Sequence, residues 1–536
     1  MNKKKLFAFL LAMQMLLLNA VSCGNGGGIG EETKKTDADA GQTGTTETSS
    51  GDAGETEEPA PEEPYAARLN VSDGLPDVTY DGKGFRFLVD QQYAYQLFSE
   101  DSSGVGLDAE IYDRNLRVED RFDIKISCMD TLGRESQDVM TQYAQVGEHV
   151  AEVVAYEQYM GNTPAIYFCW ANWTDIPYLN FDQPWWNKES IESHIINDYC
   201  FNIAGDLSLS SMQMTWCLAV NMDLMQDWGC KSEELYDLVW SGEWTLDKLM
   251  EIVAPLWVDE NGDGQGDNGD KFGYGSPIST KLETGEIACQ VRSIPWITAL
   301  GERAITVGED RMSLTNTLGT EKMYAALEKL IALHHNTKGA NQFARDDTFL
   351  NGNIGIYTAQ FDIFFSGASE IDFATGVLPL PKYDAAQQEY LTAPHVNFTM
   401  FGVPITLPEE DYGFCGIIME ALNAESWKTV YPAYYEEALK GRYSSDTNMA
   451  EMIDLITNSR VYEYGILCAQ SLGTVKLPYL VCTYISANNT DLASLLAEHD
   501  HAIKRTLAEI LTFFDVEDES GILGADYEIP DNQFGG

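Results

Sequence analysis

Short apolar runs alternate with amphipathic stretches in the first half of the chain. The run FRFLV at 85–89 predicts a strand, and 111–122 predicts a helix because its apolar residues share one face among charged neighbours. The alternation continues with strands expected at 124–126 and 151–155 and a helix at 137–143. Strands that alternate with helices in this way are typical of a parallel α/β sheet.

A similar alternation returns in the second half. Thr245 and Thr320 are good N-caps for two amphipathic helices, and strands are expected at 351–357 and 401–405. From residue 412 onward the pattern is mostly helical, with helices expected at 414–423, 430–439, 448–457 and 492–514.

Between these two regions the pattern breaks. Residues 165–186 crowd aromatic side chains around two prolines, which predicts a loop or a broken helix that carries aromatic rings. The next stretch, 201–221, predicts an extended segment, a polar turn and a second strand.

Residues 1–22 have the pattern of an export signal. Lysines precede an apolar core at 6–18, which is too short for a permanent membrane span. Small residues then precede Cys23. This resembles a bacterial lipoprotein signal, which implies cleavage before Cys23 and a lipid on its sulfur, although Ala20 stands where that signal usually has leucine. Ordinary signal cleavage beside an incidental cysteine is the alternative.

Residues 23–78 are expected to form a disordered acidic tether. The part from 24 to 64 consists of Gly, Thr, Ser, Glu, Asp and Pro with almost no apolar residue, so it cannot bury a core. Charged linkers repel themselves and extend, so this segment can hold a domain away from the extracellular face of a cell membrane.

The charge balance excludes several partners. The chain has 33 basic and 84 acidic residues, which gives a net charge of −51. Nucleic acid needs basic patches, and anionic lipid repels such a protein, so contact with a membrane is expected only through the N-terminal lipid. The ten cysteines include no Cys-x-x-Cys pair. Their apolar surroundings predict scattered buried thiols, with one or two disulfide bridges as the alternative.

An acidic, glycine-broken loop at 259–270 has the spacing of an EF-hand type of calcium loop. Oxygen donors fall at positions 1, 3, 5, 9 and 12, Gly264 falls at the sharp turn of position 6, and a backbone carbonyl falls at position 7. Asp270 stands where the motif prefers Glu, and a flanking helix is evident on one side only. A structural Ca²⁺ clip is therefore expected rather than a sensor pair, and a solvated acidic turn is the alternative. The expected ligands are Asp259, Asn261, Asp263, Gln265, Asp267 and Asp270.

Six stretches, in this order, carry a resemblance to a known family. They are RNLRVED at 114–120, QPWWN at 183–187, GDLS at 205–208, GEWTLD at 242–247, GVLPLPKY at 376–383 and YPAYY at 431–435. Together, behind the lipoprotein-like signal, they resemble the extracellular solute-binding lipoproteins of ABC importers, the family 1 carbohydrate type of Gram-positive bacteria. The resemblance covers about residue 80 to residue 515.

This resemblance implies an α/β, two-lobed fold of the periplasmic-binding-protein type, class II, with the ligand in a cleft between the lobes. Lobe one is expected to comprise 79–205 plus 383–440, and lobe two 206–382 plus 441–536. The ligand favours the closed state because it touches both lobes only there. The family implies a receptor, expected to be monomeric, that delivers its solute to the transmembrane subunits of an ABC permease.

Sugar rings have apolar C–H faces and hydroxyl edges, which suit aromatic rings placed beside Asp, Asn and Gln. Such residues cluster at the expected lobe crossings. Trp173 is the foremost candidate because polar residues flank it, and the alternative for each aromatic residue is a plain core position. A peptide or another polar solute would also suit these side chains. The candidates for ligand binding are Asn172, Trp173, Asp206, Ser211, Trp216, Trp296, Tyr357, Gln360 and Phe361.

No catalytic motif emerges from the sequence. The seven histidines lack the His-Glu-x-x-His spacing, and neither Gly-x-Ser-x-Gly nor a Walker-type loop occurs. Among 84 acidic residues some carboxylate pairs lie close by chance, so composition cannot support a glycosidase. A carbohydrate receptor without catalysis is expected. The alternative is a surface glycan-active enzyme or a non-transport glycan adhesin on the same scaffold.

Overall fold

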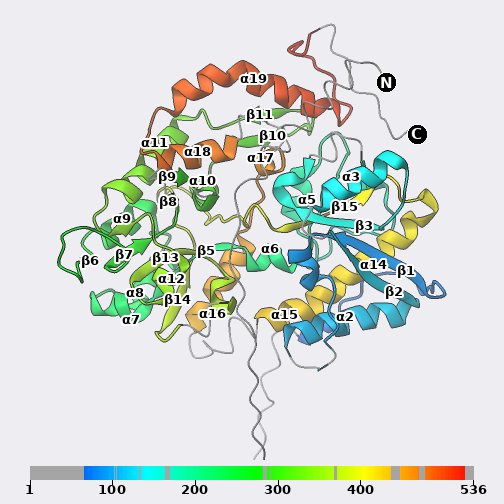
Figure 1. The fold of residues 1–536 in the computed structure, drawn as a ribbon, viewed down its shortest axis with the longest axis horizontal. Helices are drawn as coiled ribbons and strands as arrows, with labels where there is room; N and C mark the ends of the chain where they lie inside the picture. Colours follow the sequence, from blue (N-terminus) through cyan, green and yellow to red (C-terminus); the bar gives the residue numbers. More distant parts are fainter. Residues whose placement is uncertain are drawn as a thin grey trace, which may run out of the picture. The chain divides into compact units, whose positions relative to one another are not determined.

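Two mixed α/β layers organise the chain, one around each of two separate β-sheets (Figure 1). The computed structural model describes residues 66–524 except 102, 104–105, 132–134, 163–168, 282–286, 290, 367–370, 436–446 and 470–476. The predicted export signal, Cys23 and the tether as far as residue 65 therefore lie outside the described residues. Residues 63–536 belong to one unit of the structure.

The first sheet has the strand order β2-β1-β3-β15-β4. Strands β1, β2 and β3 are parallel, whereas β15 runs antiparallel to β3 and β4. In the register of the parallel strands Val89 lies opposite both Asp130 and Ala155, so the carboxyl ends of all three lie at one edge. The strands are β1 (Lys83–Val89), β2 (Ile124–Asp130), β3 (Val153–Glu157), β4 (Trp170–Ala171) and β15 (Thr399–Pro404).

The second sheet has the order β12-β7-β13-β5-β14, with β6 paired to β7. Strands β12, β7 and β13 are parallel, and β5 is antiparallel to β13 and β14. Two hairpins, β8–β9 and β10–β11, stand apart from it. The strands are β5 (Trp216–Asn221), β6 (Trp257–Val258), β7 (Lys271–Gly275), β8 (Ser279–Lys281), β9 (Ile287–Cys289), β10 (Ile305–Val307), β11 (Leu314–Asn316), β12 (Ala340–Asn341), β13 (Ile354–Gln360) and β14 (Thr375–Leu378).

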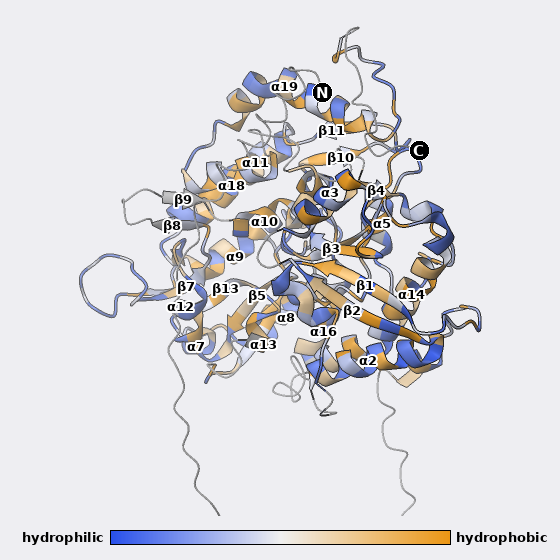
Figure 2. Cartoon of the chain, turned by 45° about the vertical axis from the view of Figure 1, so that its right-hand side comes forward, coloured by the Kyte–Doolittle hydropathy of each residue, from blue (hydrophilic) through white to orange (hydrophobic). Residues whose placement is uncertain are grey.

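Amphipathic helices cover both sheets, and Figure 2 shows the contrast between the largely apolar strands and the mixed surface of α19. The helices are α2 (Leu107–Phe122), α3 (Ser136–Val146), α5 (Lys188–His194), α6 (Leu209–Gln213), α7 (Met222–Asp227), α8 (Ser232–Trp240), α9 (Leu246–Val253), α10 (Ile294–Ala299), α11 (Glu321–Ile331), α12 (Asp346–Leu350), α13 (Ile363–Ser366), α14 (Tyr412–Glu425), α15 (Tyr431–Tyr434), α16 (Thr447–Asn458), α17 (Tyr464–Leu467), α18 (Leu477–Ser486) and α19 (Leu492–Thr512). In the described part of the chain no helix combines the length and the apolar character that crossing a bilayer requires.

The sequence pattern placed several of these elements, among them strands β1, β2, β3, β5, β13 and β15 and the longer helices. Thr245 and Thr320 cap α9 and α11 as predicted, since their side chains accept hydrogen bonds from the backbone N–H groups of Lys248 and Met323. The stretch before β5 is a correction, because it contains the short helix α6 and not only an extended segment and a turn. Its serines turn inward instead of to solvent: Ser210 is fully buried and its hydroxyl accepts from the backbone N–H of Thr399.

Each sheet takes all of its strands from the residue ranges predicted for one lobe. Every strand of the first sheet falls in 79–205 or 383–440, and every strand of the second falls in 206–382. The two-sheet α/β fold class is thereby confirmed, while the lobe boundaries stay a prediction. Apolar packing is continuous from one sheet to the other, because the larger core cluster joins Leu88 and Tyr156 of the first sheet to the side chains around the second.

Gly205 stands where the chain leaves the first sheet. A Cβ atom at this position would lie 2.2 Å from Oδ1 of Asn423 and 2.8 Å from the carbonyl oxygen of Trp185. Asn423 also accepts a hydrogen bond from the backbone N–H of Leu207, so the exit of the chain is fixed against α14. Glycine is required here by the close approach of these groups.

Two motifs of the family resemblance have structural roles in the first half. Arg114 of RNLRVED is buried on α2 and donates to the backbone carbonyls of Gln96 and Leu97. The tryptophans of QPWWN both donate from their indole N–H groups to the buried carboxyl group of Glu420. These contacts tie loops to α14 and α2 and hold the first sheet together.

The cysteine prediction is confirmed for the described residues. Eight cysteines are free thiols there, and six of them are buried. Burial raises the pKa of Cys169 and Cys200 to about 12, so both stay protonated and behave as small apolar side chains.

Candidate functional site

Carboxyl groups gather at the carboxyl edge of the first sheet. Asp90 directly follows β1 and Glu157 ends β3, and their exposed fractions are 5% and 3%. Asp90 accepts at Oδ1 from the backbone N–H of Ser136 (2.5 Å), while Glu157 accepts at Oε1 from Tyr93 (2.8 Å) and Gln92 (3.1 Å). Burial, with a smaller contribution from neighbouring carboxylates, raises the pKa of each carboxyl group to about 7.

At the corresponding edge of the second sheet, Trp216 begins β5 and pairs in register with Gln360, the last residue of β13. The imidazole ring of His395 lies 5.6 Å from the Trp216 ring, and the guanidinium of Arg292 lies 5.7 Å from it. Since the carboxyl ends of parallel strands are the usual position for ligand-binding groups in α/β folds, this edge is the counterpart of the first.

Arg292 is held rigidly at this edge. Its guanidinium forms a two-point ion pair with Asp346, with N–O distances of 2.9 and 3.1 Å, and Nη1 also donates to the Tyr357 hydroxyl at 3.1 Å. Tyr357 in turn donates to Asp346 over 2.7 Å. Burial alone would raise the pKa of Asp346, but the hydrogen bond and charge of Arg292 lower it, so the pair stays ionised. A cavity of about 380 Å³ lies beside the pair and is lined also by Thr280 and Arg345.

His395 is a neutral hydrogen-bonding group at neutral pH. Burial and the nearby charge of Arg292 lower the pKa of its imidazole to about 4. Its Nδ1 accepts from the backbone N–H of Asn397 at 3.2 Å, so the ring proton lies on Nε2.

Two of the predicted residues, Asp206 and Ser211, lie at the crossing between the sheets, and the guanidinium of Arg460 interacts with both. Ser211 accepts a hydrogen bond from Arg460 at 3.3 Å. Burial raises the pKa of Asp206 to about 7, and the charges of Arg460 and Arg68 partly offset that rise. Side chains from the two halves also meet directly here, since the Tyr95 hydroxyl donates to Oε1 of Gln213.

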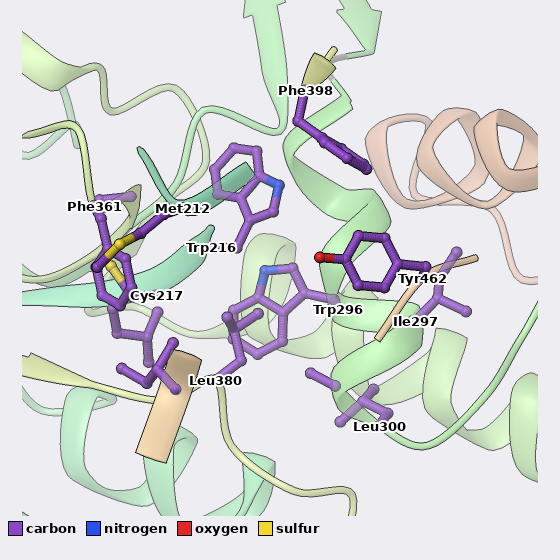
Figure 3. Packing of buried hydrophobic residues seen from close by; sticks show 14 of the residues in the cluster. Met212, Trp216, Cys217, Trp296, Ile297, Leu300, Phe361, Leu380, Phe398 and Tyr462 are labelled. Carbon is purple, nitrogen blue, oxygen red and sulfur yellow. The ribbon is translucent and has the colours of Figure 1, made fainter. Parts of the chain in front are cut away.

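Five predicted ligand-binding rings lie in the core instead of at a surface. Trp173 is fully buried, and its indole N–H donates to the carbonyl oxygen of Phe401 at 3.0 Å. The rings of Trp216, Trp296, Tyr357 and Phe361 are at most 2% exposed, and Figure 3 shows three of them, Trp216, Trp296 and Phe361, in one cluster of buried hydrophobic residues. A ring enclosed on all sides offers no face to a sugar, so these five positions have the core role that was the alternative for each of them.

Asn172 has a local structural role. Its Oδ1 accepts from the backbone N–H groups of Thr174 (3.2 Å) and Cys200 (2.9 Å), which caps the short helical turn that carries Trp173. Of the nine predicted residues, the structure therefore places Asp206 and Ser211 at the crossing and groups Trp216, Tyr357 and Gln360 at one edge, where Gln360 is half-buried and both rings are buried.

The residues that sequence reasoning missed are Asp90, Glu157, Arg292, His395 and Arg460. The first two could have been found, because the strands that precede or contain them were predicted and ligand-binding groups follow the carboxyl ends of parallel strands. Nothing in the local sequence distinguishes the other three, which reach the site only through tertiary packing.

The 259–270 loop joins β6 to β7. Asp259 accepts from the backbone N–H groups of Gly262 (2.6 Å) and Gly264 (2.8 Å), and Gly264 has a φ of +76°, as the sharp turn at position 6 requires. Asp270 is fully buried and accepts from the N–H groups of Glu260 and Asp267. Over the described residues, however, no group of three or more His, Cys, Asp or Glu side chains is arranged to hold a metal ion. The calcium site stays a prediction.

Comparisons with known proteins add little to this geometry. No family model matches the chain, and no curated protein matches it either. Among solved structures 577 chains match. One of them, the maltose-bound MalE3 of T. maritima, is 14% identical with a TM-score of 0.46, and the match covers 81% of this chain and 100% of that one. A likeness at this level supports no conclusion about a ligand, so the case for function depends on the two sheets and the polar groups at their carboxyl edges.

Proposed function

We propose that this protein is the solute-binding receptor of an ABC importer and that it captures a carbohydrate between its two halves by hinge closure. The observation that carries the proposal is a pair of separate sheets, each with polar side chains at the carboxyl ends of its parallel strands. The chain crosses between the sheets at residues 205–216 and 378–399. Such an arrangement lets a ligand touch both halves only when they close, which is how a ligand selects the closed state.

The chemistry of the edges suits a polyhydroxylated solute. Gln360 and neutral His395 supply hydrogen-bonding groups, and Arg292 is a fixed planar donor. Rigid donors and acceptors of this kind bind hydroxyl groups without needing to reorganise. The lipid on Cys23, the extracellular location at the cell membrane and the permease partner belong to the same proposal, supported by the sequence pattern at the N-terminus.

Binding without turnover is the expected result when the protein is mixed with candidate oligosaccharides. Tryptophan fluorescence should change saturably, and Arg292→Ala should weaken the affinity by about 1–3 kcal/mol because a charged donor is lost. The matched control is Arg505→Ala, whose guanidinium pairs with Glu509 along α19, far in sequence from either edge. Chromatography of the glycan after incubation tests the alternative: released products would show a glycan-active enzyme and overturn the receptor proposal.

Calcium is part of the proposal as a structural ion on the 259–270 loop. Four carboxylates on one tight loop repel one another unless a cation joins them. Chelation with EDTA should lower the melting temperature, and added Ca²⁺ should restore it. Asp259→Asn and Asp263→Asn together should remove this response. A melting temperature that ignores both EDTA and Ca²⁺ would leave the loop a solvated acidic turn.

A further inference from the structure

Within the part of the chain that the structure describes, buried polar atoms without a hydrogen-bond partner gather at the carboxyl edge of the first sheet. They are Oδ2 of Asp90, Oγ1 of Thr131 and both amide atoms of Gln137, on side chains that are 5%, 3% and 1% exposed. Thr131 directly follows β2, whose last residue lies opposite Val89, and Gln137 follows Ser136, whose N–H donates to Asp90. An unpaired buried polar atom costs about 1–3 kcal/mol. Several at one place indicate an edge that takes up a further polar group.

The charge at this edge has one sign. The charged groups that raise the pKa of Asp90 are Glu135 and Glu157, and Glu135 also raises the pKa of Glu157. As far as the structure describes the chain, no lysine, arginine or histidine forms an ion pair with these three carboxyl groups. Like charges held together in a buried place favour protonation or a cation from outside.

Tyrosine rings surround the same carboxyl groups. Tyr93 donates to Glu157, and the carboxylate of Glu157 raises the pKa of Tyr159 and Tyr479 as well. Tyr479 belongs to α18, on the side of the second sheet, and packs with Tyr159 in a small cluster that also contains Ile294. The edge is therefore covered from the other half of the molecule, and a ligand reaches it when the halves separate.

We propose that this edge binds the positively charged group of a solute, an organic ammonium such as the amine of an amino sugar, between Asp90, Glu157 and the surrounding tyrosines. The inference rests on the receptor function proposed above and specifies the class of its ligand. An ammonium group has three N–H donors and no acceptor, which complements carboxylate and hydroxyl oxygens, and tyrosine rings attract cations through their faces.

Two further features favour a cationic ligand. The net charge of −51 draws cations toward the protein, which raises the rate of encounter. On the opposite edge Arg292 is neutralised by its two-point pair with Asp346, so it does not repel a positive group brought in by the ligand.

The test compares three oligosaccharides of equal length by isothermal titration calorimetry: a glucosamine chain with free amines, its N-acetylated form and the glucose chain. The free-amine chain should bind roughly 10- to 100-fold more tightly than the other two, because hydrogen bonds to a charged group are lost with the charge. Glu157→Gln and Asp90→Asn should each abolish this preference, since the amides keep the bonds from Tyr93 and Ser136 but not the charge.

Glu152→Gln is the matched control. This glutamate is also buried but lies just before β3, at the opposite edge, where it accepts from the backbone N–H of Arg86. The variant should keep the preference for the free amine. If the neutral chains bind as tightly as the amine, the receptor function stands and the cationic site is refuted.

A thermal-shift experiment without sugar distinguishes the ammonium site from the carbohydrate receptor function. Methylammonium chloride should raise the melting temperature of the wild type above its value in sodium chloride or calcium chloride of equal ionic strength. The melting temperature of Glu157→Gln should be the same in all three salts. If this occurs while no sugar binds, the site is supported and the carbohydrate function fails. If sodium or calcium stabilises equally through Glu157, or methylammonium has no effect, the ammonium site is overturned.

Discussion

Replacing Trp173 by alanine is expected to lower the free energy of unfolding by about 3–5 kcal/mol, which is the usual cost of removing a buried tryptophan. The ring is fully enclosed in the core of the first sheet and contributes a hydrogen bond from its indole N–H to Phe401. Chemical denaturation measures the loss. Trp173→Phe should recover most of the packing and cost about 0.5–1.5 kcal/mol for the lost indole hydrogen bond, since the Phe401 carbonyl keeps the bond from the backbone N–H of Ile203.

Trp240 provides the control for this experiment. It ends α8 with 49% of its surface exposed, so Trp240→Ala should change stability by no more than about 0.5 kcal/mol. The result also decides between the two roles of Trp173. A variant that keeps its stability but loses affinity for the glycan would return Trp173 to the binding surface and contradict the core position.

The elements of the fold that could be predicted are those whose hydrophobic periodicity is complete within a short stretch of sequence. The run at 85–89 and the helix at 111–122 carry their periodicity in a few neighbouring residues, and both appear in the structure as β1 and α2. Helix α6 was missed because its five residues Leu209–Gln213 are too few to show a period, and its serines are typical of a turn. Tertiary contacts with β15 decide the conformation there.

The candidate site was less predictable than the fold. Trp173 and Trp216 were both candidates because each follows polar residues near an expected crossing, yet both lie in the core, the second with Arg292 and His395 beside its ring. Arg292 and Asp346 are separated by 54 residues and meet only through the packing of the second sheet. Residue type predicts what a side chain can bind, whereas exposure and partners depend on the complete fold.

The second large effect is a loss of stability as the pH rises from 6.5 to 8. Burial raises the pKa of Asp90, Glu157, Asp206 and Glu420 to about 7 in the folded protein, well above the ordinary values of these carboxyl groups. Between the ordinary value and 7 the folded state therefore binds more protons than the unfolded state. The sign of the linkage follows: stability is greatest while these groups are protonated and falls as the pH passes through their folded pKa.

Histidines oppose this trend only at lower pH. Burial lowers the pKa of His194 and His334 to about 3 and, together with Arg292, lowers that of His395 to about 4. Their contribution is lost as the pH falls below about 6.5, where the unfolded chain takes up protons. Above pH 6.5 they are neutral in the folded state and largely so in the unfolded state, so the carboxyl groups dominate.

The expected decrease between pH 6.5 and pH 8 is about 1–3 kcal/mol, since one unit of pKa difference corresponds to about 1.4 kcal/mol. Urea denaturation at four pH values measures it. Glu157→Gln should flatten the slope because it removes one titrating group and keeps the acceptor for Tyr93. A stability that rises toward pH 8 would show that these carboxyl groups are ionised and paired in the folded protein, and it would remove the unpaired acidic edge on which the ammonium site depends.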